Sequence, residues 1–97
     1  MVNLKNNHGL KISLYISDIT GYPMVIVLAD MEWYNNNSSC SFEKLCDYQE
    51  RISKTFHEVL ESLQTESTPL SNDTMLERLT REVINYGFTY DFAKVVA

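Results

Sequence analysis

The sequence predicts an α+β fold in which a small antiparallel β-sheet packs against two α-helices. Apolar and polar residues alternate between positions 10 and 16, which is typical of a half-buried strand. Between positions 42 and 64 the apolar residues instead recur at steps of three and four, which indicates an amphipathic helix. With 97 residues, of which 44% are apolar and 22% charged, the chain is expected to form a single domain over residues 1–97.

The alternating segment and the apolar run that follows it are expected to form a β-hairpin. The run 24–29 is rich in β-branched and other apolar residues and supplies the second strand. Since this run is apolar on both faces, we expect it to lie at the centre of the sheet or to be covered on both sides. Gly21 and Pro23 supply turn chemistry in the connection 18–23, which is too short for a crossover, so the two strands should be antiparallel.

The helix expected over residues 42–64 follows an Asn/Ser-rich break at 35–39. Ser39 or Ser41 can cap its first turn, where the helix dipole favours the carboxylate of Glu43. At 3.6 residues per turn the helix has about six turns. Its apolar positions are Phe42, Leu45, Cys46, Ile52, Phe56, Val59, Leu60 and Leu63.

A second helix is expected after the Ser/Thr-rich connection 64–73. Thr74 and Glu77 have the spacing of a capping box, and Gly87 is suited to end the helix in the left-handed conformation. The segment 88–97 then alternates like an edge strand, although Thr89 offers an alternative start for a last helical turn; we predict the strand. The apolar positions of the second helix are Met75, Leu76, Leu79, Val83 and Tyr86.

The residue types that serve catalysis and metal binding are few and poorly spaced. His8 and His57 are the only histidines, whereas a zinc site needs three or four Cys, His or carboxylate ligands. The spacing of Cys40 and Cys46 matches neither a redox nor a zinc motif. The paired carboxylates fall on helix faces that should be exposed, so we expect no buried acid for acid–base work. We therefore expect no metal, no cofactor and no enzymatic activity; the enzymatic alternative is a nucleophilic Cys40 with His8 as its base.

The charge balance narrows the choice of partner. A net charge of −5 disfavours direct binding to nucleic acid or to an anionic membrane. The first eleven residues lack the apolar stretch of a secretory signal, and no run approaches the roughly 20 apolar residues of a membrane-spanning helix. We expect a cytoplasmic monomer, located in the host cytoplasm if a phage encodes it.

The excess negative charge is concentrated in one segment. Residues 30–66 hold eight acidic and three basic side chains, a net of −5, whereas residues 1–29 carry +1 and residues 67–97 carry −1. In the ordinary interpretation these acids form a solvated helix face stabilised by ion pairs at i,i+4, namely Asp47–Arg51 and Glu50–Lys54. In the functional interpretation an acidic strip meets a basic groove on a partner. The strip would consist of Glu43, Asp47, Glu50, Glu58 and Glu61.

A second candidate surface follows the expected hairpin. Trp33 and Tyr34 stand outside its best apolar face, and Asp30 and Glu32 lie beside them. Exposed Trp and Tyr side chains are enriched in interface hot spots, whereas buried ones are ordinary core residues, and the sequence leaves both interpretations open. In the first interpretation, these four residues form an acidic–aromatic anchor for a partner.

In its length, its lack of a catalytic motif and its acidic helix Glu43–Glu61, the chain resembles the small acidic inhibitors encoded by phages and mobile elements, among them anti-CRISPR proteins and DNA mimics. The resemblance implies binding to a larger basic protein or ribonucleoprotein, whose nucleic-acid-binding surface the chain would occupy by partial DNA mimicry. One alternative is an immunity protein or antitoxin that neutralises a basic nuclease toxin. Another is a structural or adaptor subunit whose strand 24–29 pairs with another copy.

Overall fold

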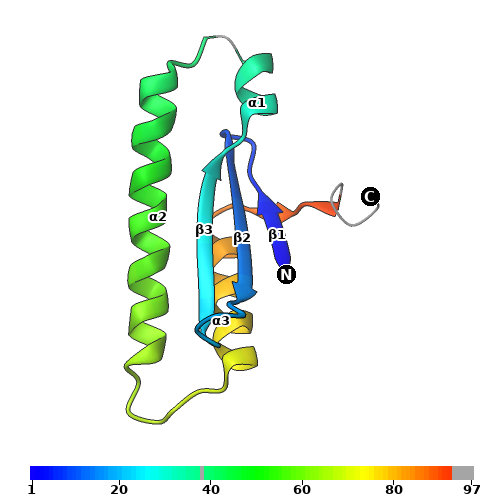
Figure 1. Cartoon of the computed structure of the whole chain (residues 1–97). Coiled ribbons are helices and arrows are strands. Elements are labelled where there is room, and N and C mark those ends of the chain that lie inside the picture. The colour runs from blue at the N-terminus through cyan, green and yellow to red at the C-terminus, as the bar shows by residue number, and fades with distance from the viewer. Residues whose placement is uncertain (38, 93–97) are drawn as a thin grey trace.

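The computed structural model describes residues 1–37 and 39–92, and within them four strands and three helices (Figure 1). The strands form one antiparallel sheet in the order β3-β2-β1-β4. The predicted α+β fold is confirmed, with β1 and α1 as additional elements. In chain order the elements are β1 (Val2–Lys5), β2 (Leu10–Ile16), β3 (Pro23–Ala29), α1 (Met31–Asn36), α2 (Phe42–Gln64), α3 (Asn72–Asn85) and β4 (Thr89–Tyr90).

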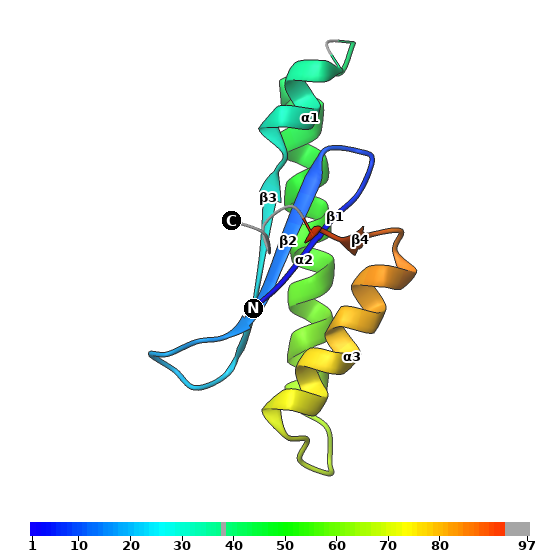
Figure 2. The same ribbon diagram turned by 90° about the vertical axis from the view of Figure 1, so that its right-hand side faces the viewer.

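The two long helices, α2 and α3, pack on the same face of the sheet. In Figure 2, α2 lies behind the strands and α3 lies beside it. Along β3, Val25 and Val27 are buried towards the helices, whereas Ile26 and Leu28 point the other way and are 38% and 54% exposed. Among the described residues no helix covers this second side, which we call the open face of the sheet.

The hydrophobic core lies between the sheet and the two long helices. Phe56 of α2 is fully buried and makes edge-to-face contacts with Tyr86 and Phe88, with ring centroids 5.1 Å and 6.2 Å apart. Aromatic pairs of this geometry contribute about 0.5–1.5 kcal/mol beyond the burial of their surface. The other buried members of the cluster are Leu4, Leu10, Ile12, Leu14, Val25, Val27, Leu45, Ile52, Leu60, Leu79 and Val83.

The β2–β3 hairpin forms as predicted, but the expected position of β3 is wrong. The register runs from Leu10 opposite Ala29 to Ile16 opposite Pro23, and Gly21 in the turn adopts a φ of +74°. Contrary to expectation, β3 lies at the edge of the sheet and is open on one face. The apolar run shows that both rows of side chains can be buried, but it does not show whether a second layer is present to cover the outer row.

Strand β1 is too short for its alternation to be recognised in the sequence. Only Leu4 of its four residues is buried, and it lies opposite Ile12 of β2. On the open face, Ser13 Oγ donates a hydrogen bond of 2.8 Å to Asn3 Oδ1. This strand separates β2 from the other edge of the sheet, so β2 rather than β3 is one of the two central strands.

Helix α2 has the bounds that its apolar spacing predicts, Phe42–Gln64. Of the two proposed capping residues, Ser41 is the N-cap, and its Oγ accepts a hydrogen bond of 3.4 Å from the backbone N–H of Lys44. The buried positions follow the helical repeat and fix the rotation of the helix about its axis. These positions are Leu45, Ile52, Phe56 and Leu60.

Helix α3 begins at Asn72, one turn of sequence earlier than the capping box predicts. Ser71 is the N-cap, and its Oγ accepts a hydrogen bond of 3.2 Å from the backbone N–H of Thr74. The predicted Thr74–Glu77 box is therefore wrong, because Thr74 lies inside the first turn and its hydroxyl accepts from Ser71 Oγ at 2.8 Å. The capping-box pattern favours Thr74 because Glu77 follows it by three residues, whereas Ser71 has no Glu or Gln at the corresponding position.

The chain after α3 turns back to the sheet as predicted. Gly87 has a φ of +98° and Phe88 is 1% exposed in the core. The predicted C-terminal strand is present only as β4, in which Thr89 and Tyr90 pair with β1. Residues 88, 91 and 92 are described but are not part of the strand, and the rest of that prediction, over residues 93–97, lies outside the described residues.

Candidate protein-binding surface

The acidic face of α2 is the group of five carboxylates formed by Glu43, Asp47, Glu50, Glu58 and Glu61. At about 100° per residue, these positions fall within an arc of about 80° around the helix axis. The arc lies roughly opposite the buried positions, such as Ile52 and Phe56. All five side chains are exposed. The packing of α2 therefore directs the whole acidic face away from the core.

The acidic face carries no ion pair within the described part of the chain. The pairs proposed in the ordinary interpretation of this face, Asp47–Arg51 and Glu50–Lys54, do not form there, and the Arg51 guanidinium lies over the Tyr48 ring at 5.3 Å. With Lys54 as the one cation inside the arc, the negative charge is only partly compensated. The ion pairs found among the described residues are Lys11–Asp30, Arg78–Glu66 and Arg81–Glu77.

The spacing of the acidic face sets a limit on how closely it imitates nucleic acid. The 18 positions that separate its first and last members span about 27 Å at about 1.5 Å per residue. The five carboxylates along that length have a mean spacing of about 7 Å, whereas the charges along one strand of a DNA duplex are about 3.4 Å apart. The face therefore matches a row of separated Lys or Arg side chains better than a continuous phosphate-binding track.

An open groove borders the acidic face on the side of α3. It has a volume of about 710 Å³ and brings Glu58 close to Arg78 and Arg81 of α3. Arg78 Nη1 is bound to Glu66 Oε1 at 3.1 Å, and Arg81 Nη2 lies 3.9 Å from Glu77 Oε1. Both arginines thus have acidic neighbours of their own. The groove is lined by Thr55, Glu58, Val59, Ser62, Leu63, Arg78, Arg81 and Glu82.

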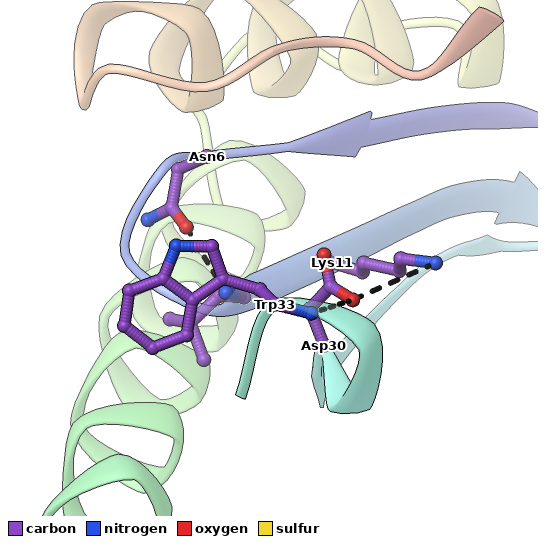
Figure 3. A network of polar contacts seen from close by, with 5 residues as sticks. Asn6, Lys11, Asp30 and Trp33 are labelled. Atoms are coloured by element: carbon purple, nitrogen blue, oxygen red, sulfur yellow. Dashed lines mark hydrogen bonds and ion pairs between the residues drawn. The ribbon is translucent and has the colours of Figure 1, made fainter. Parts of the chain in front are cut away.

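Asp30, the first residue of the predicted acidic–aromatic anchor, is used inside the fold (Figure 3). It is 8% exposed and is the N-cap of α1, where its Oδ1 accepts from the backbone N–H of Trp33 at 3.2 Å. The same oxygen lies 4.0 Å from Lys11 Nζ. The expectation that no acid is buried is wrong, since Asp91 is also only 4% exposed. Tertiary packing of α1 and β4, which the sequence pattern does not reveal, buries both side chains.

The aromatic members of the anchor pack between α1 and the rest of the chain. Trp33 is half-buried and its ring lies so close to Gly9 that a Cβ there would be 2.6 Å from Trp33 Cε3. Tyr34 is half-buried and meets the Phe42 ring edge-on, with centroids 5.3 Å apart. Glu32 is the exposed member of the group. The two rings thus hold α1 in place, and their role in binding a partner stays a prediction.

A polar recess beside α1 joins residues that are far apart in the sequence. Asn6 is buried in it; its Oδ1 accepts from the backbone N–H groups of His8 and Leu10, and its Nδ2 donates to Tyr48 Oη at 3.1 Å. Asn37 Nδ2 donates to the Trp33 carbonyl at 2.7 Å. These amides connect the β1–β2 turn to α1 and α2. The recess therefore supports the fold around Trp33, and the sequence gives no signal of it because the contacts are non-local.

No hydrogen bond joins Cys40 to His8, the pair considered for catalysis, in the described part of the chain. His57 Nδ1 donates to the Ser53 carbonyl at 2.7 Å on the exposed surface of α2, and the Cys40 thiol makes a contact of 3.6 Å with the Ser41 carbonyl. Residues 1–37 and 39–92 contain no group of three or more His, Cys, Asp or Glu side chains placed to hold a metal. Nor does a helix in these ranges have the length and apolarity needed to cross a bilayer.

Comparisons with protein families, with curated proteins and with solved structures found no match to this chain. A function is therefore inferred from the surface alone. The described surface offers two features that exceed what the fold needs: the acidic face of α2, and the unpaired edge of β3.

Proposed function

We propose that this chain is a small acidic binding protein that inhibits a nucleic-acid-handling protein or ribonucleoprotein by occupying its basic nucleic-acid-binding surface. The acidic face of α2 is the surface that makes the contact. The observation that carries the proposal is the alignment of five exposed carboxylates, without an ion pair among the described residues, along one side of a single helix. A field of this kind steers a basic partner and fixes its orientation.

The rigidity of α2 supports this role. Four buried side chains anchor the helix to the sheet, so its carboxylates are held in a row before any partner arrives. A preorganised surface binds more tightly than a flexible acidic segment, because less conformational entropy is lost on association. The partner should present Lys or Arg groups at a mean spacing of about 7 Å over about 27 Å.

The test is a triple charge reversal at one end of the acidic face. The substitutions Glu43→Lys, Asp47→Lys and Glu50→Lys change the net charge from −5 to +1, since each replaces a negative by a positive charge. The control reverses three acids of α3 and changes the net charge by the same amount. The control substitutions are Asp73→Lys, Glu77→Lys and Glu82→Lys.

Each protein is immobilised and exposed to a host lysate from which nucleic acid has been depleted, at salt concentrations between about 0.1 M and about 1 M. Across this range the Debye length, which sets the reach of electrostatic interactions, falls from about 10 Å to about 3 Å. We expect the native chain and the α3 control to capture the same basic protein at low salt and to release it as salt rises. The α2 variant should not capture it. Capture by the folded α2 variant at the native level, or capture that is insensitive to salt, contradicts the proposal.

A further inference from the structure

The outer edge of β3 is an unpaired strand edge in the described part of the chain. Antiparallel neighbours alternate between hydrogen-bonded and non-hydrogen-bonded pairs. Asp30 N–H donates to the Gly9 carbonyl at 2.7 Å, and the Tyr22 carbonyl accepts from Ser17 at 2.9 Å, so the even-numbered residues of β3 bond to β2. The odd-numbered residues Pro23, Val25, Val27 and Ala29 therefore direct their backbone groups outwards.

Two of these outward positions cannot take part in an ordinary ladder. Pro23 has no N–H to donate. The carbonyl of Val27 already accepts a hydrogen bond of 2.6 Å from Gln49 Nε2 of α2. Between residues 23 and 27, the edge is left with the N–H groups of Val25 and Val27 as donors and the carbonyls of Pro23 and Val25 as acceptors.

These donors and acceptors match a second copy of the same edge. When Val25 lies opposite Val25 of a second, antiparallel copy, the two residues exchange both backbone hydrogen bonds. Val27 then donates to the Pro23 carbonyl of the second copy. The missing N–H of Pro23 falls opposite the Val27 carbonyl, which Gln49 already occupies. In this register every outward group from 23 to 27 is satisfied, whereas a register with Val25 opposite Val27 needs the occupied carbonyl as an acceptor.

The side chains around this edge also suit a copy of the same chain. Residues 22–29 carry no charge, and the open face of β3 presents Ile26 and Leu28 to solvent. The neighbouring flank of α2 carries Phe42, Cys46 and Ser53, which are uncharged as well. By the helical repeat, the centre of the acidic face lies about 100° around α2 from this flank, so uncharged side chains rather than the acidic face border the β3 edge.

We propose that two copies of this chain pair antiparallel through β3, with Val25 at the two-fold axis, and so form one continuous sheet with four strands from each copy. The uncharged edge favours neither an acidic nor a basic strand, and its backbone pattern is self-complementary. The proposed dimer differs from the monomer that we expect from the sequence. It is independent of the proposed function, because the acidic face and the β3 edge lie on different sides of α2.

The oligomeric state of the native chain and of one edge variant tests the proposal. Ile26→Lys introduces a charge on the exposed part of the edge strand, a substitution that blocks strand pairing in natural sheets. Ile84→Lys, on α3, adds the same charge away from the edge at a position that is 39% exposed, close to the 38% of Ile26. By sedimentation equilibrium, the native chain and the Ile84 variant should show twice the monomer mass, and the Ile26 variant should dissociate at least about tenfold more readily. Circular dichroism checks that all three are folded.

A native chain that stays monomeric up to millimolar concentration overturns the proposal. So does a dimer that the Ile26 and Ile84 substitutions affect equally, because it must then use another surface. If the chain is monomeric and binds a strand-forming peptide through this edge, the edge has a different occupant and the proposed dimer is wrong.

Disulfide cross-linking tests the register, with Cys40 and Cys46 replaced by serine. In the proposed register Met24 lies opposite Ile26 of the second copy in a non-hydrogen-bonded pair, whose Cα atoms are about 4.5 Å apart. This separation lies within the range of a disulfide. The double variant Met24→Cys/Ile26→Cys should form a covalent dimer on oxidation, and Ile26→Cys alone should not. Efficient cross-linking of the single variant places Ile26 opposite itself and overturns the register.

Discussion

The substitution Gly9→Ala tests whether Trp33 is a fixed part of the fold. Gly9 has a φ of +94°, a backbone angle that residues other than glycine rarely adopt. A Cβ at this position would lie 2.6 Å from Trp33 Cε3, 2.9 Å from Trp33 Cζ3 and 2.8 Å from Leu45 Cδ1. Alanine therefore adds backbone strain and also pushes the indole ring and the Leu45 side chain away from position 9.

The expected loss of stability is the sum of these two effects. The left-handed backbone costs about 1–2 kcal/mol for a residue with a Cβ. Overpacking against well-ordered side chains costs about 1–3 kcal/mol more. The free energy of unfolding should fall by about 2–5 kcal/mol, which is a large fraction of the 5–15 kcal/mol typical of a domain. A loss of about 3.5 kcal/mol lowers the Tm by about 14–28 °C in a domain of this size.

Gly21→Ala is the matched control, because Gly21 also has a positive φ, of +74°, but a Cβ there meets nothing within 4 Å. It should show the backbone cost alone. The assay is urea unfolding of both variants at equal protein concentration, followed by circular dichroism. If Gly9→Ala and Gly21→Ala differ by less than about 0.5 kcal/mol, Trp33 is not packed on Gly9 as described, and the assignment of this ring to the fold is refuted.

Two further substitutions probe the contacts that hold the elements in place. Asn6→Ala removes three hydrogen bonds from a buried side chain, so the free energy of unfolding measured by urea titration should fall by about 2–3 kcal/mol. The control Asn7→Ala, at an exposed position, should change this free energy by less than about 0.5 kcal/mol. Ser41→Ala removes the N-cap of α2 and should lower the Tm by about 4–8 °C, for a loss of about 1 kcal/mol; an unchanged Tm in a thermal scan would show that another group caps the helix.

The elements that are best predicted from the sequence are those whose pattern of buried residues repeats over many consecutive positions or follows a short local rule. Helix α2 repeats its apolar spacing over 23 residues, so its bounds can be predicted without knowledge of its neighbours. The hairpin is defined by the alternation in β2 and by the turn around Gly21. At the end of α3, Gly87 and Phe88 likewise follow a local capping rule.

The elements that the sequence does not predict depend on contacts between distant residues. Strand β1 has four residues, α1 has six, and neither is long enough to show a period. The edge position of β3 depends on β1 pairing with the other side of β2. Asp30 becomes a buried cap only because α1 forms next to Lys11.

The same distinction between local and non-local contacts separates the candidate surfaces that can be predicted from the sequence from those that cannot. The acidic face of α2 follows from the helical repeat, so its members could be grouped from the sequence alone. The acidic–aromatic anchor could not be judged, since the packing of Trp33 on Gly9 is non-local. The backbone pattern of the β3 edge depends on Gln49, which reaches Val27 across 22 positions of sequence.

A competition experiment tests most directly whether the acidic face of α2 takes the place of nucleic acid on a basic partner. Labelled nucleic acid is bound to the partner that the native chain captures, and the chain is added at increasing salt. We expect the native chain to displace the nucleic acid in a mutually exclusive manner, and we expect the triple α2 variant not to displace it. The inhibition constant of the native chain, corrected for the affinity of the nucleic acid at the same salt, should weaken as salt rises. A ternary complex of chain, partner and nucleic acid, or an inhibition constant that does not change with salt, would contradict this role of the acidic face.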